Sequence, residues 1–215
     1  ISYERRELDT ALNTIAKAIP PEKQMKANPR HLLLYASLLD KKGQREAALQ
    51  NLTRLKNESI NYGPGVLYYA DFHLRNGKPK EALRALQYLI RNPGLLEGMQ
   101  RADAFAVTAK TFESLGMMDQ ALRFAKAAFS SHYNRDEVVD LLFRIKSKIP
   151  KYKDAYSYIV NARQADKAKI IDKAINEYVR ALEINRRDAM PFMLLADLYE
   201  TKGEIYEAID RYTKA

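Results

Sequence analysis

Apolar residues along this chain recur at the spacing of helix faces rather than of strands. Between residues 32 and 39 they stand at i, i+3, i+4 and i+7, on one helix face: Leu32, Tyr35, Ala36 and Leu39. Gly43 follows at the place where a left-handed residue ends a helix at little cost. A second apolar stripe runs through residues 48–55. The pattern predicts a helical hairpin, which buries its apolar face only by stacking on neighbours.

The same hairpin pattern recurs along most of the sequence. Four units have a glycine at the turn, with an alanine five residues later and another seven residues earlier: Gly43, Gly77, Gly116 and Gly203. Gly43 and Gly77 are 34 residues apart, and Lys169 takes the turn position of a fifth unit. Small residues let two helix axes approach closely where they cross. Ala70, Ala109 and Ala196 are therefore predicted to be buried.

This arrangement resembles the tetratricopeptide repeat, a 34-residue unit of two antiparallel helices. The last unit carries the family's pattern of large and small residues most fully: Phe192, Leu195, Ala196, Tyr199, Gly203, Ala208, Tyr212 and Ala215. The consensus proline is missing from every complete unit. The resemblance implies an all-α fold, an α-solenoid of stacked hairpins forming a right-handed superhelix, with about eleven or twelve helices and no β-sheet.

The repeat register divides the chain, with two irregularities. Residues 1–28 are expected to form the second helix of an upstream repeat plus a linker, followed by repeats at 29–62, 63–96, 102–135, 155–188 and 189–215, the last truncated. A longer connection is expected at 92–101, and an extra helix at 136–154. One helix in place of a pair predicts either a break or kink in the superhelix there, or a disordered segment that separates two blocks. The chain begins at Ile1 and ends within a helical pattern, which indicates a fragment of a longer chain.

Composition and charge narrow the class of protein. The 215 residues include no cysteine, which excludes disulfides, thiol nucleophiles and thiolate metal sites. No apolar run is long enough to cross a bilayer. A formal charge of +9, from 36 Lys and Arg against 27 Asp and Glu, is compatible with nucleic acid, an anionic surface or an acidic partner. The localisation stays open between periplasm and cytoplasm.

A search for catalytic and metal-binding patterns finds none. The sequence lacks HExxH, GxSxG, a Walker glycine loop and the dinucleotide-binding glycine pattern. His31, His73 and His132 lie in different units, with no second histidine at ligand spacing. We therefore expect no enzyme activity, no cofactor and no metal site.

Candidate partner-binding residues follow from the resemblance. In tetratricopeptide domains, fixed positions of the first helix face the concave groove, and the register places six residues of mixed character there: Tyr68, Asp71, Arg75, Lys110, Arg163 and Lys167. The family's clamp for a chaperone's C-terminal carboxylate is absent, because the positions that would carry its asparagine do not. The groove is expected to take an extended or helical peptide with some acidic residues.

These observations favour a non-enzymatic scaffold for protein–protein interaction. By analogy of fold, the scaffold could serve a bacterial assembly or secretion complex such as one for exopolysaccharide export. One alternative is a helical-repeat RNA-binding module, prompted by the positive charge, although pentatricopeptide repeats have a period of 35 and the groove positions mix charges. Another is a docking module of an enzyme or transporter whose active part lies outside this sequence.

Overall fold

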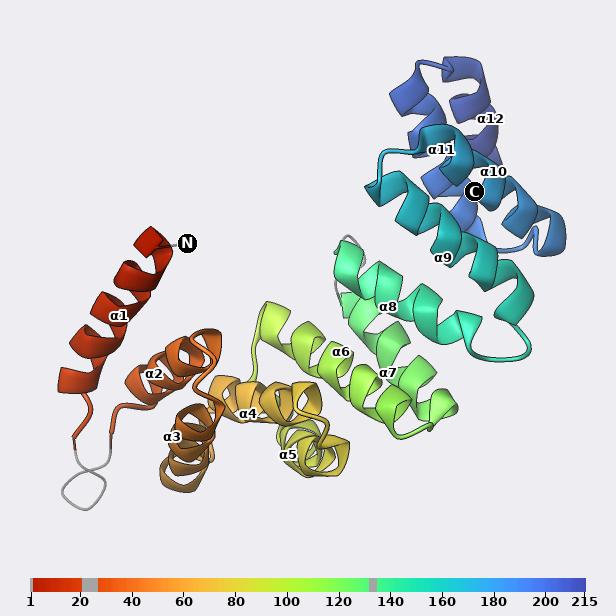
Figure 1. Ribbon diagram of the computed structural model, residues 1–215. Helices are drawn as coiled ribbons and strands as arrows, with labels where there is room; N and C mark the ends of the chain where they lie inside the picture. The colour runs from red at the N-terminus through yellow and green to blue at the C-terminus, as the bar shows by residue number, and fades with distance from the viewer. Residues whose placement is uncertain (1, 21–26, 132–134) are drawn as a thin grey trace. The chain divides into compact units, whose positions relative to one another are not determined.

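The chain is a succession of helices. The structure, a computed structural model, describes residues 2–20, 27–131 and 135–215, and the side chains of all of these except residues 2–5. Those residues form twelve α-helices and one short 3-10 helix, with no β-strand among them (Figure 1). The expected all-α fold is confirmed. The expected number of helices, eleven or twelve, agrees with the twelve α-helices of the described residues.

Contacts divide the chain into two compact units, Ile1–Leu115 and Gly116–Ala215. The first unit holds α1 (Ser2–Lys17), α2 (Pro29–Lys41), α3 (Arg45–Glu58), α4 (Gly63–Arg75), α5 (Pro79–Arg91), η1 (Pro93–Leu95) and α6 (Gly98–Ser114). The second unit holds α7 (Met118–Ser131), α8 (Asp136–Ser147), α9 (Lys153–Lys167), α10 (Ile171–Ile184), α11 (Ala189–Lys202) and α12 (Ile205–Lys214).

Tight turns separate the two helices of each hairpin. The turn glycines adopt the left-handed conformation, with φ of 82° at Gly43 and 80° at Gly203. After the first of these, the Gln44 backbone N–H donates to the Leu39 carbonyl at 2.9 Å, which satisfies one of the carbonyls left free at the end of α2. Lys169 takes the same conformation with φ of 60°, although a side chain there is strained. The hairpin turn therefore forms even where the glycine is missing.

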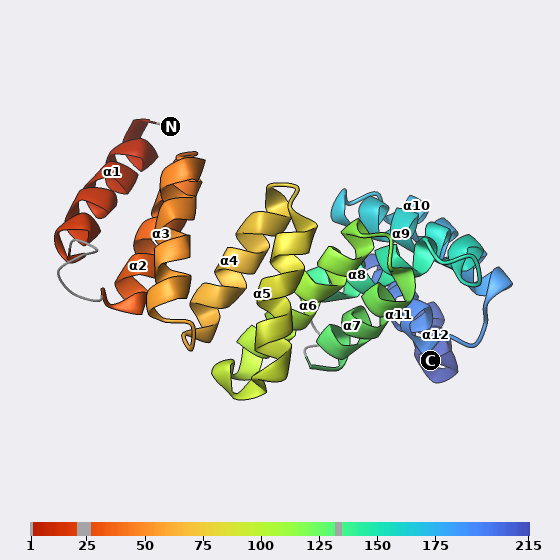
Figure 2. The ribbon, with the colours of Figure 1, turned by 90° about the horizontal axis from the view of Figure 1, so that it is seen from below.

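Within the first unit, α2 packs on α3 and α4 packs on α5, and Figure 2 shows each pair side by side. Ala36 of α2 and Ala48 of α3 are both fully buried and belong to one apolar cluster. Ala70 of α4 is fully buried as well, as predicted. The small side chains let the paired helices approach closely, which is why they recur at the same positions.

The longer connection after α5 is packed against the start of α4. Leu96 is buried in the same cluster as Val66 and Leu86. A Cβ at Gly63 would overlap the carbonyl oxygen of Leu95, so only glycine permits this approach. The additional residues of the connection are thus part of the core of the first unit.

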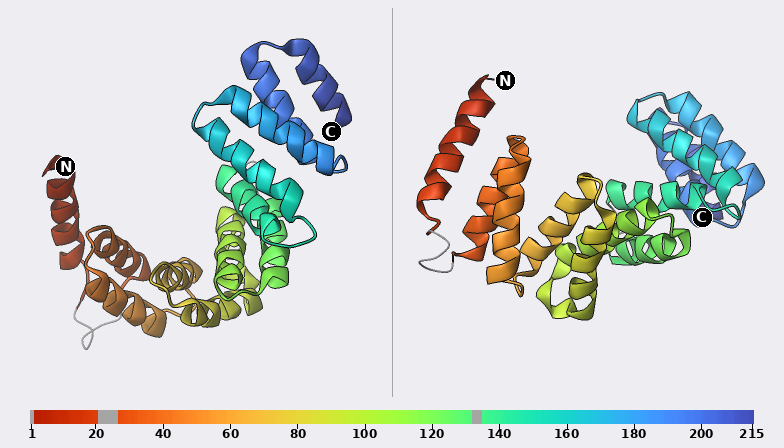
Figure 3. Two further views of the ribbon diagram at one scale, coloured as in Figure 1. Left: turned by 45° about the vertical axis from the view of Figure 1, so that its right-hand side comes forward. Right: turned by 60° about the horizontal axis from the view of Figure 1, so that its bottom comes forward.

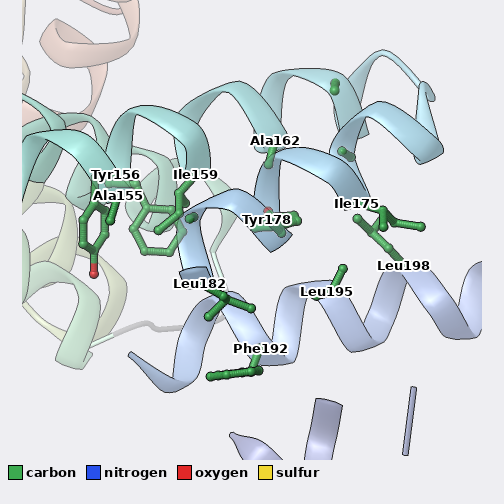
Figure 4. Packing of buried hydrophobic residues seen from close by; sticks show 14 of the residues in the cluster. Ala155, Tyr156, Ile159, Ala162, Ile175, Tyr178, Leu182, Phe192, Leu195 and Leu198 are labelled. Carbon is green, nitrogen blue, oxygen red and sulfur yellow. The ribbon is translucent and has the colours of Figure 1, made fainter. Parts of the chain in front are cut away.

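In the second unit, α9 packs on α10 and α11 packs on α12, as Figure 3 shows. Tyr156, Ile159, Tyr178 and Leu195 form its core (Figure 4). Ala196 of α11 has no exposed surface, and the same holds for Ala109 of α6 in the first unit. Both alanines are buried as the sequence predicts.

The extra helix predicted at 136–154 corresponds to α8 and the turn after it. α8 packs on α7 and on α9, and Val139 and Phe143 belong to the same buried cluster as Tyr156. Lys146 of α8 donates a hydrogen bond to the Tyr156 hydroxyl, which donates in turn to Asp188. Asp188 is the residue that caps α11. The division between the compact units falls at Leu115, and a break of the superhelix at 136–154 stays a prediction.

Candidate binding surface

Three of the predicted binding residues lie together on α4. The Arg75 Nε donates to Asp71 at 2.8 Å, and its Nη2 donates to Asp40 of α2, also at 2.8 Å. The Tyr68 hydroxyl donates to the same Asp40 carboxylate at 2.9 Å. The Arg75 guanidinium also lies 5.8 Å from the centre of the Tyr68 ring. Asp40 thus ties the first helices of two successive repeats together.

The charges of this cluster stabilise one another. Burial and the hydrogen bond to Asp40 raise the pKa of Tyr68 to about 12, so the phenol stays protonated as a donor. Burial alone would lower the pKa of Arg75, but its hydrogen bonds to Asp40 and Asp71 outweigh that effect and raise it. The Arg75 side chain remains 46% exposed, so the guanidinium can still meet a carboxylate of a partner.

In the second unit, Arg163 and Lys167 of α9 face two carboxylates of α8. The Arg163 Nε donates to Asp140 at 2.8 Å and its Nη2 donates to Asp136 at 2.9 Å. Lys167 forms a hydrogen-bonded ion pair with Asp140. Arg163 is only 8% exposed, whereas half of the Lys167 side chain reaches solvent. Arg163 therefore stabilises the packing of α9 on α8, whereas Lys167 is exposed enough for a partner to reach it.

Burial would raise the pKa of Asp140, but hydrogen bonds and charge attraction from Lys167 and Arg163 hold it below the ordinary aspartate value. For Arg163 the balance is similar: burial lowers its pKa, while the hydrogen bonds to Asp140 and Asp136 raise it. Asp140 and Arg163 are therefore both charged at neutral pH.

A small cavity of about 140 Å³ opens beside this ion-pair cluster. Its wall combines apolar residues and cations with one carboxylate and one amide: Asp140, Phe143, Arg144, Val160, Arg163, Gln164 and Lys167. Val160 is a partly exposed apolar side chain in this wall, Phe143 is buried behind it, and the surrounding cations favour a carboxylate next to them. This cavity joins two of the predicted residues to a concave surface within one unit.

Lys110 lies on α6 in the first unit and is partly buried. The six predicted residues therefore fall into a set on α4 and α6 and a set on α9. That both sets contact one partner stays a prediction.

Sequence reasoning missed the acidic partners Asp40, Asp136 and Asp140. Asp40 stands at the twelfth position of the repeat 29–62, which the family's register also places toward the groove. Asp136 and Asp140 are spaced i, i+4 on the extra helix, which presents both carboxylates to α9. That acidic pair was the available signal, but which helix it would face depends on the tertiary packing of α8.

Among the described residues, no group of three or more His, Cys, Asp or Glu side chains could hold a metal ion. His73 is buried beside Tyr69, with 4.4 Å between the ring centres, and its ring nitrogens have no hydrogen-bond partner in that part of the chain. Burial and the nearby charge of Lys78 lower its pKa, which favours the neutral ring. His132 lies outside the described residues. Over the same residues, no helix is both long and apolar enough to cross a membrane.

The sequence matches no model of a known protein family, and no curated protein matches it. Its structure, in contrast, is similar to solved structures of helical-repeat proteins. A tetratricopeptide repeat protein from Parabacteroides merdae ATCC 43184 superposes with a TM-score of 0.56 at 14% identity, over 91% of this chain and 79% of that one. The tetratricopeptide protein YrrB, whose structure is described as having an unusual peptide-binding site, gives 0.53 at 17% identity, over 95% of this chain and 91% of that one.

The chain has the tetratricopeptide fold. A third similar structure, the hetero-tetramer Cut9–Hcn1 of the APC/C, gives a TM-score of 0.53 at 16% identity and covers 99% of this chain but 43% of that one. At these identities the likeness establishes the fold. What the tetratricopeptide units of this chain bind depends on their own surfaces.

Proposed function

We propose that this chain is a non-enzymatic scaffold that binds a partner protein through acidic peptide segments. The observation that carries the proposal is the cavity between α8 and α9, where Phe143 and Val160 adjoin the cations of α9. Such a surface can bind an extended peptide that places one apolar side chain in the cavity and a carboxylate near Lys167.

The cluster on α4 supports the same kind of partner. Arg75 is partly exposed and already oriented by two carboxylates, so a peptide carboxylate would meet a side chain that loses little conformational freedom. Tyr68 offers an aromatic surface beside it. The narrower expectation of a bacterial assembly or secretion complex, such as one for exopolysaccharide export, stays a prediction, as does the docking of an enzyme or transporter.

The test is a selection from a display library of random 12-residue peptides on the purified chain. We expect the enriched peptides to combine Asp or Glu with an apolar residue. Their affinity, measured by calorimetry, should fall at least tenfold in Lys167→Glu and less in Lys167→Met, which keeps the stem of the side chain but removes its charge. Lys126→Glu, an exposed charge reversal on α7, is the matched control and should leave the affinity unchanged.

Enrichment of peptides without acidic residues would contradict the proposal, as would no enrichment over an unrelated helical protein. So would equal losses of affinity in Lys167→Glu and Lys126→Glu. Circular dichroism of each variant checks that its helices are intact.

A further inference from the structure

A second concave surface lies on the other helices of the second unit, between α10 and α12. It is an open groove of about 500 Å³, within the range of volumes common for binding sites. Its floor is apolar and consists of Val179 and Leu182 of α10 with Phe192 of α11. Neither α8 nor α9 contributes to it, so it is separate from the cavity beside Lys167.

The rim of this groove is predominantly cationic. Arg186, Arg211 and Lys214 surround the floor, against the one carboxylate of Glu183. Arg186 is exposed and forms no ion pair within the described part of the chain. A single carboxylate, Asp210, neighbours the other two cations, 2.6 Å from Lys214 and 3.7 Å from Arg211.

The Arg211 side chain adds a specific unmet requirement. Its Nε is buried without a hydrogen-bond acceptor among the described residues, and at 3.7 Å the Asp210 oxygen is beyond hydrogen-bond distance. A buried donor without an acceptor is unfavourable, and Asp210 faces the charge of Arg211 without satisfying this donor. On α9, in contrast, Arg163 and Lys167 already have carboxylate partners on α8.

We propose that the groove between α10 and α12 binds an amphipathic helix of a partner protein, with acidic residues along the margins of its apolar face. Charge complementarity determines the choice of partner, because three cations surround an apolar floor against two carboxylates, those of Glu183 and Asp210. A helix lying in the groove presents apolar residues at i, i+3 and i+4 to Val179, Leu182 and Phe192. Asp or Glu beside those residues reaches the cationic rim.

The test uses a display library of 18-residue peptides with a fixed apolar stripe at helical spacing and random flanking positions. Panned on the full chain, the library should yield peptides with Asp or Glu flanking the stripe, and these should gain helicity on binding, seen by circular dichroism. Their affinity should fall at least tenfold in the double variant Arg186→Glu with Lys214→Glu. Lys173→Glu, an exposed charge reversal on α10 away from the groove, should leave the affinity within twofold.

Methyl-labelled NMR spectra locate the bound peptide. The signals of Val179 and Leu182 should shift, while that of Val160 in the α8–α9 cavity should not. The Lys167→Glu variant should bind these peptides normally, so failure of this proposal and failure of the proposed function are distinguishable. If the double variant changes the helix content, Arg186→Ala with Lys214→Ala replaces it, with an expected loss of at least threefold.

Several outcomes would overturn the proposal. One is selection of peptides with neutral or basic flanks, and another is full affinity in the double variant. Shifts at Val160 without shifts at Val179 would place the peptide in the other cavity. A concentration-dependent dimer of the unliganded chain that the double variant abolishes would assign the groove to a second copy instead.

Discussion

At the scale of single residues, Gly63 is the position where the backbone leaves the least room. A Cβ there would overlap the Leu95 carbonyl oxygen, while at Gly94 it would meet nothing within 4 Å. Alanine normally stabilises a helix relative to glycine by roughly 0.5–1 kcal/mol, so the clash must reverse the sign. We expect Gly63→Ala to lower the free energy of unfolding by about 1–3 kcal/mol, as overpacking does.

Urea denaturation of Gly63→Ala against the parent measures this difference. Gly94→Ala is the control and should stay within about 0.5 kcal/mol of the parent, as surface substitutions usually do. If Gly63→Ala is as stable as the parent, the connection after α5 does not pack on α4 as described.

The Asp140 carboxylate makes stability depend on pH. Its pKa in the folded chain is lowered, so it contributes stability above the unfolded value of about 3.9, and that contribution disappears as the pH falls through the lowered pKa. Asp140→Asn leaves Arg163 and Lys167 without that charge. We expect the free energy of unfolding to fall by about 1–3 kcal/mol at pH 7. This loss should begin to shrink below about pH 4 and disappear as the pH passes the lowered pKa.

Denaturation curves of Asp140→Asn and the parent between pH 3 and pH 7 measure this. Glu137→Gln on the same helix removes a carboxylate that is 77% exposed and 3.9 Å from Arg135, so its cost should be at most about 1 kcal/mol. A loss in Asp140→Asn that is independent of pH would show that the ion pairs with α9 are not its cause.

At the scale of helices, the crossings depend on small residues. Ala196 of α11 has no exposed surface. Its helix packs on α12 within the second unit. Ala196→Leu should therefore cost on the order of 1–3 kcal/mol through overpacking. Ala189→Leu, at the exposed start of the same helix, adds the same side chain without a clash. Thermal melts compare the two, and equal melting temperatures would mean that the repeat register is wrong.

Helices and turns were predictable because their causes are local. The apolar stripe through Leu32 and Leu39, the turn at Gly43 and the buried alanines depend on residues a few positions apart. The contact of Leu95 with Gly63 and the facing of Asp140 to Arg163 depend on residues distant in sequence. The sequence therefore predicted the helices and their buried alanines, but not that carboxylates of neighbouring helices pair with Arg75, Arg163 and Lys167.

At the scale of the whole molecule, the net charge of +9 is compatible with an acidic peptide partner or with RNA. Many cations already have intramolecular partners, including Arg75, Arg163 and Lys167. Cations that are paired with carboxylates of the same chain do not form the continuous cationic track that the phosphates of RNA would require. RNA binding would be favoured by a row of cations without carboxylate partners.

The most direct test of protein binding is a fluorescence anisotropy titration of the chain against two labelled probes, at 50 mM and 200 mM salt. One probe is the tightest acidic peptide from the library selections, and the other is a single-stranded RNA of 20 nucleotides. We predict saturable peptide binding at both salt concentrations, and RNA binding that is weaker at 50 mM and lost at 200 mM. Saturable RNA binding at 200 mM that is tighter than peptide binding would contradict the account.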